Sequence, residues 1–161
     1  MTTRFGIGYD VHKMQEGRAL ILGGVKVDFH KGLAGHSDAD VLMHALIDAL
    51  LGAAGLRDIG FHFPDSDKKY QDIDSTLLLK EVLLKINSKG FEVNNVDMTI
   101  VCQKPNLFAY IPLMIKKIAE AMCILEERVN VKATTTEGLG FTGREEGIAA
   151  LAVASIQEIN R

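Results

Sequence analysis

Residues 36–53 read HSDADVLMHALIDALLGA, and the organisation of the chain follows from this stretch. Its apolar side chains recur three and four residues apart, which is the spacing of an amphipathic helix: Val41, Leu42, Ala45, Leu46, Ala49 and Leu50. Ser37 precedes the run, and Asp40 lies three positions after it, which is a variant of the capping box. The stretch therefore predicts a helix that is capped at Ser37 and ends between Gly52 and Gly55.

The predicted helix carries a row of polar side chains on one face. Asp40, His44 and Asp48 are spaced four residues apart, so they share that face. Asp10 and His12 lie two residues apart at the end of a predicted strand, and side chains at that spacing point to the same side. A surface turn and a solvated helix face would explain each group alone. Together, Asp10, His12 and His44 predict a metal site, because three nitrogen and oxygen ligands with an open fourth position hold a catalytic zinc ion.

Strands and helices are predicted on both sides of this stretch. In residues 4–10, apolar side chains alternate at Phe5, Ile7 and Tyr9, which predicts a half-buried strand. A hairpin is expected around Gly23 and its neighbouring glycine, within 18–29. The same criteria predict strands at 91–103 and 128–136 and helices at 74–89 and 107–123.

Two segments are less regular. Residues 57–74 follow no stable period, so a long loop with a functional role is expected there. The tail 146–159 suits a strand by its alternation and a helix by its composition, and both interpretations remain open. The sequence contains no linker and no internal repeat. Residues 1–161 are therefore predicted to form a single α+β domain.

Composition limits the classes of protein that the chain can represent. Its 161 residues are 47% hydrophobic and 24% charged, which is typical of one domain with its own core. The net charge is -3 and no basic stripe is present, so nucleic acid is not an expected partner. A phosphorylated substrate must then be held by a local device, such as a metal or backbone amides.

The location of the protein is also predicted from the sequence. Cys102 and Cys123 are too few for a disulfide framework or a cysteine-based zinc site. No apolar run reaches the ~20 residues that a membrane span needs, and residues 1–30 show no basic segment followed by an apolar run. We expect a soluble, unprocessed protein in a reducing cytoplasm, with no membrane partner.

A third polar segment, residues 133–144, reads ATTTEGLGFTGR. Threonine hydroxyls and the free amides of glycine-rich backbone can bind phosphate oxygens, and Glu137 can hold a hard cation such as Mg²⁺. The alternative is a glycine-rich hairpin in which threonine simply favours the strand. That alternative leaves Glu137 and Arg144 without a role.

Several motifs in one order carry a family resemblance: GYDVH at 8–12, HSDADVLMHALIDALLGA at 36–53, DIGFHFPDSD at 58–67, NVDMTIVCQKP at 95–105 and NVKATTTEGLGFTGREEGIA at 130–149. Together they resemble the 2-C-methyl-D-erythritol 2,4-cyclodiphosphate synthase family along nearly the whole chain. The most specific part is ATTTE-x-LGFTGR.

The resemblance implies a reaction and a fold. Members of the family convert 4-diphosphocytidyl-2-C-methyl-D-erythritol 2-phosphate into the cyclic diphosphate and CMP, a step of non-mevalonate isoprenoid biosynthesis, by metal-assisted attack of the 2-phosphate on the β-phosphate. The implied fold is a mixed β-sheet covered by helices on one face. Three copies pack their sheets around a three-fold axis, with active sites between neighbouring chains. In this fold the tail 146–159 is a strand.

The resemblance also implies roles for individual residues. Asp10, His12 and His44 resemble the zinc ligands, and Glu137 resembles the ligand of Mg²⁺ or Mn²⁺. His36 and Thr135 match the residues at the transferring phosphate and are the expected catalytic residues. The implied substrate contacts are Asp10, His12, His36, Ser37, Asp48, Asp58, Ile59, Gly60, Phe63, Pro64, Asp65, Ser66, Asp67, Cys102, Gln103, Lys104, Pro105, Asn106, Leu107, Phe108, Thr134, Thr135, Thr136, Glu137, Phe141 and Arg144.

Two features qualify this assignment. Asn106 and Ala109 stand where the family commonly has Lys and Pro, so we expect weaker nucleotide binding with the reaction intact. Arg144 lies, with Phe5 and Glu146, where the three-fold cavity of the family can hold an isoprenoid diphosphate. Two other functions fit parts of the pattern: a zinc-dependent phosphohydrolase, and a non-catalytic trimeric nucleotide-binding protein.

Overall fold

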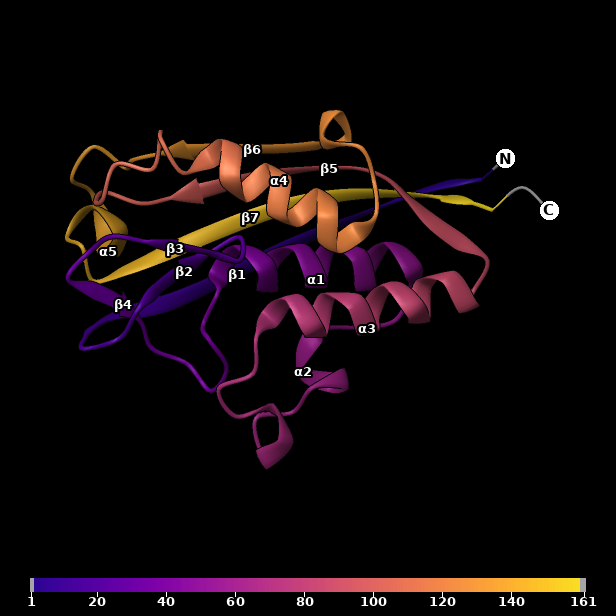
Figure 1. Cartoon of the computed structure of the whole chain (residues 1–161), viewed down its shortest axis with the longest axis horizontal. Coiled ribbons are helices and arrows are strands. Elements are labelled where there is room, and N and C mark those ends of the chain that lie inside the picture. The colour runs from indigo at the N-terminus through magenta and orange to yellow at the C-terminus, as the bar shows by residue number, and fades with distance from the viewer. Residues whose placement is uncertain (1, 160–161) are drawn as a thin grey trace.

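The computed structural model describes residues 2–159, which build one mixed five-stranded sheet with its long helices on one face (Figure 1). In spatial order the strands are β4 (Lys31–Leu33), β1 (Thr3–Glu16), β7 (Gly147–Glu158), β5 (Phe91–Val101) and β6 (Val129–Thr134). The pair β5 and β6 is parallel, and the other neighbours are antiparallel. The predicted α+β fold is confirmed, and the ambiguous tail is the strand β7.

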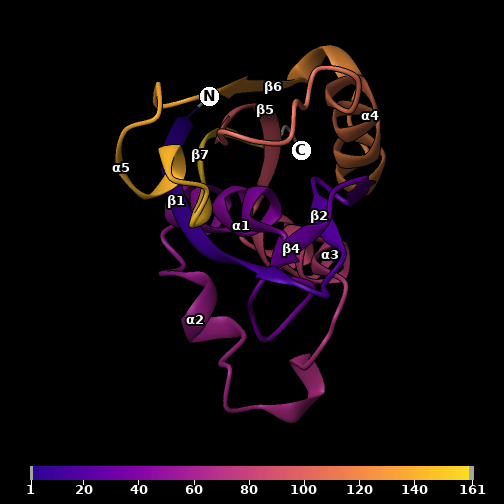
Figure 2. The same ribbon diagram turned by 90° about the vertical axis from the view of Figure 1, so that its left-hand side faces the viewer.

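Helix α1 (Val41–Ala54) lies in the hollow of the curved sheet, as the end-on view shows (Figure 2). Every residue of α1 except His44, Asp48 and Gly52 is buried. The start of the helix differs from the prediction, because Asp40 is its N-cap and Ser37 lies outside it. The end matches the expectation, since Gly55 closes the helix at a φ of 68°.

The cap is Asp40 because its carboxylate binds three backbone amides at once. Oδ1 accepts from Met43 N–H at 3.0 Å and from Gly23 N–H at 2.9 Å, and Oδ2 accepts from Gly24 N–H at 2.7 Å. The glycines form the turn between β2 (Leu20–Leu22) and β3 (Val25–Val27), which confirms the predicted hairpin. Asp40 therefore fastens this hairpin to the start of α1.

The alternating apolar side chains in the first half of β1 do not lie on the covered face of the sheet. Phe5 and Ile7 are each 71% exposed, and Tyr9 is exposed too, on the face away from α1. Gly6 and Gly8 occupy the covered face instead, and Asp10 and His12 continue it. The prediction of a strand at 4–10 is confirmed, but its apolar side faces outward in the single chain.

Segment 57–74 contains more regular structure than the long loop that its sequence predicts. It contains the short helix α2 (Ile59–His62) and the 3-10 turn η1 (Lys68–Tyr70). Each begins at an aspartate whose side chain accepts a backbone N–H: Asp58 from Phe61 and Asp67 from Lys69. Local capping therefore orders a segment that has no hydrophobic period.

Three further helices complete the chain. Helix α3 (Ser75–Ser88) matches its prediction, and α4 (Ile111–Met122) begins later than predicted. After the turn η2 (Glu126–Arg128) and β6, the chain enters the short helix α5 (Gly140–Gly143) before β7. The interpretation of 133–144 as a hairpin is wrong, because β6 pairs with β5 and not with β7.

Within residues 2–159, no helix is both long enough and apolar enough to cross a membrane.

Candidate metal centre

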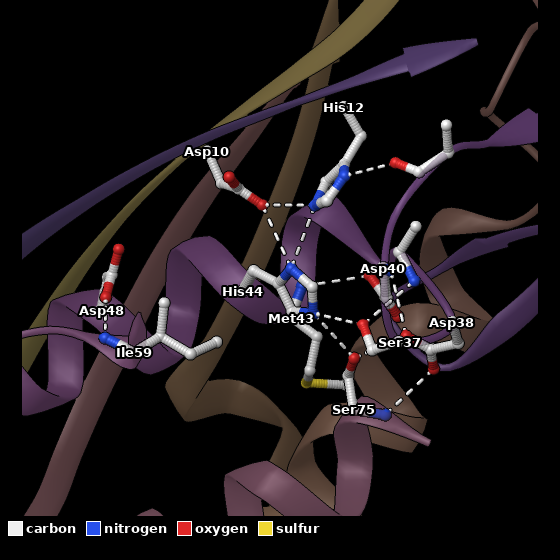
Figure 3. A network of polar contacts seen from close by, with 12 residues as sticks. Asp10, His12, Ser37, Asp38, Asp40, Met43, His44, Asp48, Ile59 and Ser75 are labelled. Atoms are coloured by element: carbon white, nitrogen blue, oxygen red, sulfur yellow. Dashed lines mark hydrogen bonds and ion pairs between the residues drawn. The ribbon is translucent and has the colours of Figure 1, made fainter. Parts of the chain in front are cut away.

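Asp10, His12 and His44, which we call the triad, meet where β1 passes over α1 (Figure 3). Asp10 and His12 point from the covered face of β1, and His44 rises toward them from the first half of α1. Glycines on β1 allow this approach: a Cβ on Gly6 would lie 2.0 Å from the carbonyl oxygen of Ala49. The site therefore depends on a strand and a helix packed backbone to backbone.

The three inward atoms of the triad form a small triangle. His12 Nε2 lies 2.9 Å from Asp10 Oδ2 and 3.1 Å from His44 Nδ1, and His44 Nδ1 lies 3.2 Å from Asp10 Oδ2. Zinc ligands at about 2.0–2.1 Å in a tetrahedron stand about 3.3 Å apart. The triangle thus fits one face of a tetrahedral site with its fourth position open, and the predicted convergence of the triad is confirmed.

The protonation of His12 suits a ligand role. Its Nδ1 donates to the carbonyl oxygen of Ala34 at 2.7 Å, and a carbonyl can only accept. In the neutral ring, Nε2 therefore carries a lone pair and points at the carboxylate of Asp10. Two acceptors face each other at this point, and a cation between them satisfies both.

The charges at the triad favour a cation as well. Burial would raise the pKa of Asp10, but hydrogen bonds from His12 and His44 outweigh it and lower that pKa to about 2. Burial would lower the pKa of His12, but its hydrogen bond to Asp10 and the charge of that carboxylate outweigh burial and raise it. Asp10 is ionised at neutral pH, so the site attracts a proton or a metal ion.

The triad forms one wall of a cavity of about 390 Å³, within the usual size for a small-molecule site. The predicted site residues that line it are Asp10, His12, His36, Ser37, His44, Ile59, Gly60, Phe63, Pro64 and Asp65. Gly35, Tyr70 and Leu78 line it too, and sequence reasoning missed them. Tyr70 packs edge-on against the ring of Phe63, a contact that no local pattern predicts.

Four other predicted contacts do not line this cavity: Asp48, Asp58, Ser66 and Asp67. Asp48 instead accepts the N–H of Ile59 at 2.7 Å, so it holds α2 beside α1. Burial raises the pKa of Asp48, and that hydrogen bond offsets part of the shift. With Asp58 and Asp67 as caps, these carboxylates shape the segment that covers the cavity.

His36 and Ser37 line the cavity beside the triad. Ser37 Oγ lies 3.1 Å from His44 Nε2, and the buried His36 Nε2 has no hydrogen-bond partner within residues 2–159. Arg18 holds this turn, because its guanidinium donates to the carbonyls of Ser37 at 2.9 Å and Gly35 at 3.3 Å. Arg18 lies in the predicted hairpin, and nothing in its local sequence marks it as part of a site.

A second cavity, of about 490 Å³, contains the other group of predicted residues. It is lined by Phe29, Cys102, Gln103, Lys104, Pro105, Asn106, Leu107, Ala133, Thr134 and Thr135, of which Phe29 and Ala133 are not predicted from the sequence. Phe108 and Thr136 do not line it. Burial raises the pKa of the Cys102 thiol to about 12, so this group is not a nucleophile.

Thr135 and Glu137 are not brought to the triad within one chain. Thr135 lines the second cavity, and Glu137 is exposed at the turn after β6, with a φ of 55°. Phe141 lines a third hollow of about 560 Å³ together with Val11, His12, Lys13, Glu146 and Gly147. Arg144 forms an exposed ion pair with Glu146 at 3.1 Å.

A family model and individual relatives match nearly the whole length of the chain. The model of the YgbB family matches residues 3–157. The 2-C-methyl-D-erythritol 2,4-cyclodiphosphate synthase of Clostridium novyi is 57% identical over 155 residues, which cover 96% of this chain and 99% of the relative. The synthase of the same name from Syntrophomonas wolfei is 59% identical, with the same coverage.

Solved structures share the fold. The CDP complex of IspF from Plasmodium falciparum has a TM-score of 0.86 at 34% identity, over 98% of this chain and 97% of that one. The bifunctional IspDF of Campylobacter jejuni has a TM-score of 0.96 at 45% identity, where 99% of this chain matches 43% of the longer protein.

Proposed function

The chain belongs to the YgbB family of 2-C-methyl-D-erythritol 2,4-cyclodiphosphate synthases, and on this premise we propose how its residues bind substrate and close the ring. The reaction converts 4-diphosphocytidyl-2-C-methyl-D-erythritol 2-phosphate into the cyclic diphosphate and CMP. An oxygen of the 2-phosphate bonds to the β-phosphorus, and the bond from that phosphorus to the oxygen bridging the two phosphates breaks. Water takes no part, so the enzyme is a phosphorus–oxygen lyase.

The observation that carries the proposal is the convergence of the triad on the wall of the 390 Å³ cavity. Two imidazoles and one carboxylate suit zinc, and Glu137 offers the hard oxygen ligand that Mg²⁺ or Mn²⁺ prefers. When bound, such ions polarise the phosphoryl oxygens and offset their charge. This matters because two unit charges about 4 Å apart repel by roughly 4 kcal/mol at an effective dielectric near 20.

Residues of the cavity position the phosphates and the sugar. His36 has a buried Nε2 without a partner among the described residues, which suits a contact to a phosphoryl oxygen, and Ser37 lies next to it. The segment 58–67 covers the cavity and binds the methylerythritol half. Holding both phosphates in one cavity makes the attack intramolecular and supplies the orientation that the reaction needs. The attacking phosphate is already ionised near neutral pH, so no general base is required.

The cytidine half binds in the second cavity, at residues 102–107 and 133–135. Among the residues that the structure describes, the linings of the two cavities have no member in common. A second copy of the chain that brings its nucleotide cavity beside the triad would complete the site. Thr135 and Glu137 would reach the phosphates from that neighbouring copy.

The exposed face of the sheet supports such an assembly. Its apolar side chains include Phe5, Ile7, Tyr9, Leu151 and Val153, all exposed in the single chain. Exposed apolar patches of this kind mark interaction sites. We assign this face to a homotrimer, packed around a three-fold axis. A light-scattering mass of one chain at micromolar concentration would contradict the assignment.

An isoprenoid diphosphate in the centre of the trimer is the proposed additional ligand. Phe5 and Arg144 would line its cavity, although the guanidinium of Arg144 is already paired with Glu146. A calorimetric titration of the trimer with an isoprenoid diphosphate tests this assignment, with saturable heat as the expected result and absent heat as the contrary one.

The function is tested by ³¹P NMR on the diphosphocytidyl substrate. Cyclic diphosphate and CMP in equal amounts are expected. A zinc-dependent phosphohydrolase would release acyclic phosphates by consuming water. A non-catalytic nucleotide-binding protein would bind the substrate and leave its spectrum unchanged.

A further inference from the structure

The ring of His44 is held at both of its nitrogens (Figure 3). Nδ1 faces Asp10 and His12, and Nε2 lies 2.9 Å from the hydroxyl oxygen of Ser75. Ser75 is the first residue of α3 and is fully buried. A neutral imidazole has one N–H and one lone pair, so the hydrogen bond at Nε2 decides what Nδ1 presents to a metal.

The direction of that hydrogen bond is set by Asp38. One carboxylate oxygen of Asp38 accepts the backbone N–H of Ser75 at 3.0 Å, and the other accepts the Ser75 hydroxyl proton. A carboxylate has no proton to give back. The hydroxyl of Ser75 therefore turns only lone pairs toward His44, which favours a hydrogen on Nε2, whereas the ionised carboxylate of Asp10 favours one on Nδ1 until a metal ion lies between them.

We propose that Ser75, oriented by Asp38, is a positioning residue that holds His44 as the Nε2–H tautomer and so directs the Nδ1 lone pair to the metal. The inference rests on the proposed metal-ligand role of His44. Partners of this kind fix ring orientation and tautomer in metal sites, and their loss typically costs about 10–100-fold in metal affinity or activity.

The same contacts anchor the end of segment 57–74, whose residues 58–67 cover the cavity. Just before Ser75, the amide of Asp72 donates to the carbonyl of His36 at 2.8 Å, and the amide of Asp38 donates to the carbonyl of Ile73 at 3.1 Å. Ser75 thus lies where segment 57–74 ends beside the triad. The hydrogen bonds that orient His44 therefore adjoin those that hold segment 57–74 in place.

Ser75→Ala tests the proposal by removing the hydroxyl that accepts from His44. The partner of Nε2 that remains among residues 2–159 is the Ser37 hydroxyl, which can either donate or accept, so the Nδ1–H tautomer that Asp10 favours should gain population. The measurements are ¹⁵N shifts of the His44 ring in the metal-free protein at alkaline pH, and zinc affinity by chelator competition. We expect a larger Nε2–H fraction in the wild type than in the variant, and zinc binding at least about tenfold weaker in the variant.

Asp38→Ala provides a second test, because it keeps the Ser75 hydroxyl but removes the carboxylate that orients it. Without its carboxylate partner, the Ser75 hydroxyl is free to donate to Nε2, which favours the Nδ1–H tautomer. This variant should therefore bind zinc more weakly than Ser75→Ala, although Asp38 does not contact His44. Ser88→Ala is the matched control, because Ser88 lies in α3 and its exposed hydroxyl donates to the carbonyl of Lys85, away from His44.

A Ser75→Ala protein with the wild-type tautomer ratio and wild-type zinc affinity would overturn the proposal. Both readouts are independent of turnover. If the wild type forms no CMP, the proposed function fails, while the ring signals still decide whether Ser75 sets the tautomer.

Discussion

A Cβ atom on Gly8 would lie 1.8 Å from the carbonyl oxygen of Ala45, so β1 and α1 meet at a distance that only glycine allows. Ala45 follows the triad residue His44, and Gly8 precedes Asp10 by two positions on the same face of β1. The geometry of the triad is therefore set by backbone packing as much as by its own side chains.

We predict that Gly8→Ala weakens both the fold and the metal site. The added methyl group must push α1 away from β1, which should cost about 1–3 kcal/mol or more of unfolding free energy and lower zinc affinity. Urea unfolding and chelator competition measure the two effects. Gly52→Ala is the control: its Cβ would meet nothing nearer than 4.0 Å, and alanine favours a helix interior by up to about 1 kcal/mol. Equal stability of the Gly8 variant and the wild type would refute the packing argument.

Arg18→Ala should impair catalysis without impairing metal binding. The guanidinium holds the carbonyls of Gly35 and Ser37, and the turn between them carries His36. Loosening this turn should lower kcat/KM by about tenfold, which corresponds to about 1.4 kcal/mol. Arg18→Lys should recover only part of the loss, because an ammonium lacks the two-pronged fork. Steady-state rates at saturating zinc provide the measurement, and unchanged kinetics for the alanine variant would contradict it.

Asp40→Asn should destabilise the protein although it removes a buried charge. The three backbone amides need acceptors, and the amide group of asparagine would place a donor against one of them. The expected loss is about 1–3 kcal/mol of unfolding free energy at neutral pH, measured by urea unfolding. Asp74→Asn is the control, since asparagine caps α3 as well as aspartate does. An equal loss of unfolding free energy in both variants would show that the contacts of Asp40 with the three amides contribute no more than an ordinary helix cap.

Asp40 should also make the stability of the protein depend on pH. Burial, with a contribution from Asp38, raises the pKa of Asp40 to about 6 in the folded chain, above its ordinary value of 3.8. Between about pH 4 and pH 6 the unfolded chain loses this proton first, so wild-type stability falls relative to Asp40→Asn as pH rises. Urea unfolding across this range measures the difference. If the difference in unfolding free energy between the two proteins stays constant with pH, the pKa of Asp40 is not raised in the folded chain.

Asn106→Lys should strengthen nucleotide binding. Asn106 lines the second cavity, and its side chain accepts the N–H of Phe108 at 2.9 Å instead of offering a cation. A lysine there would add a positive charge near the diphosphate, for which several-fold tighter CDP binding is expected. Calorimetric titration with CDP is the measurement. An unchanged affinity would show that the asparagine does not weaken nucleotide binding in this chain.

Much of the fold follows from local patterns. Periodicity and caps locate β1, α1, α3, β6 and the hairpin, and residue spacing alone brings Asp10, His12 and His44 together as candidates. The tail is undecided locally, because β7 alternates small apolar residues that suit helix and strand alike; only the family resemblance makes it a strand.

Other features depend on contacts between distant segments. Ser37 has the sequence position of a helix cap, but Asp40 also binds the amides of Gly23 and Gly24, which local sequence does not reveal. Arg18 and Ser75 support the site from elements far along the chain. The resemblance groups Thr135 and Glu137 with the triad, yet one chain keeps them apart, which fits a site completed by a neighbouring copy.

The central claim is that Asp10, His12 and His44 share one metal ion. Anomalous diffraction at the zinc edge, from crystals of the zinc-loaded protein, tests it most directly. We predict one peak about 2.0–2.2 Å from Asp10 Oδ2, His12 Nε2 and His44 Nδ1. A zinc peak at another site, with none at the triad in protein that turns over substrate, would contradict the account.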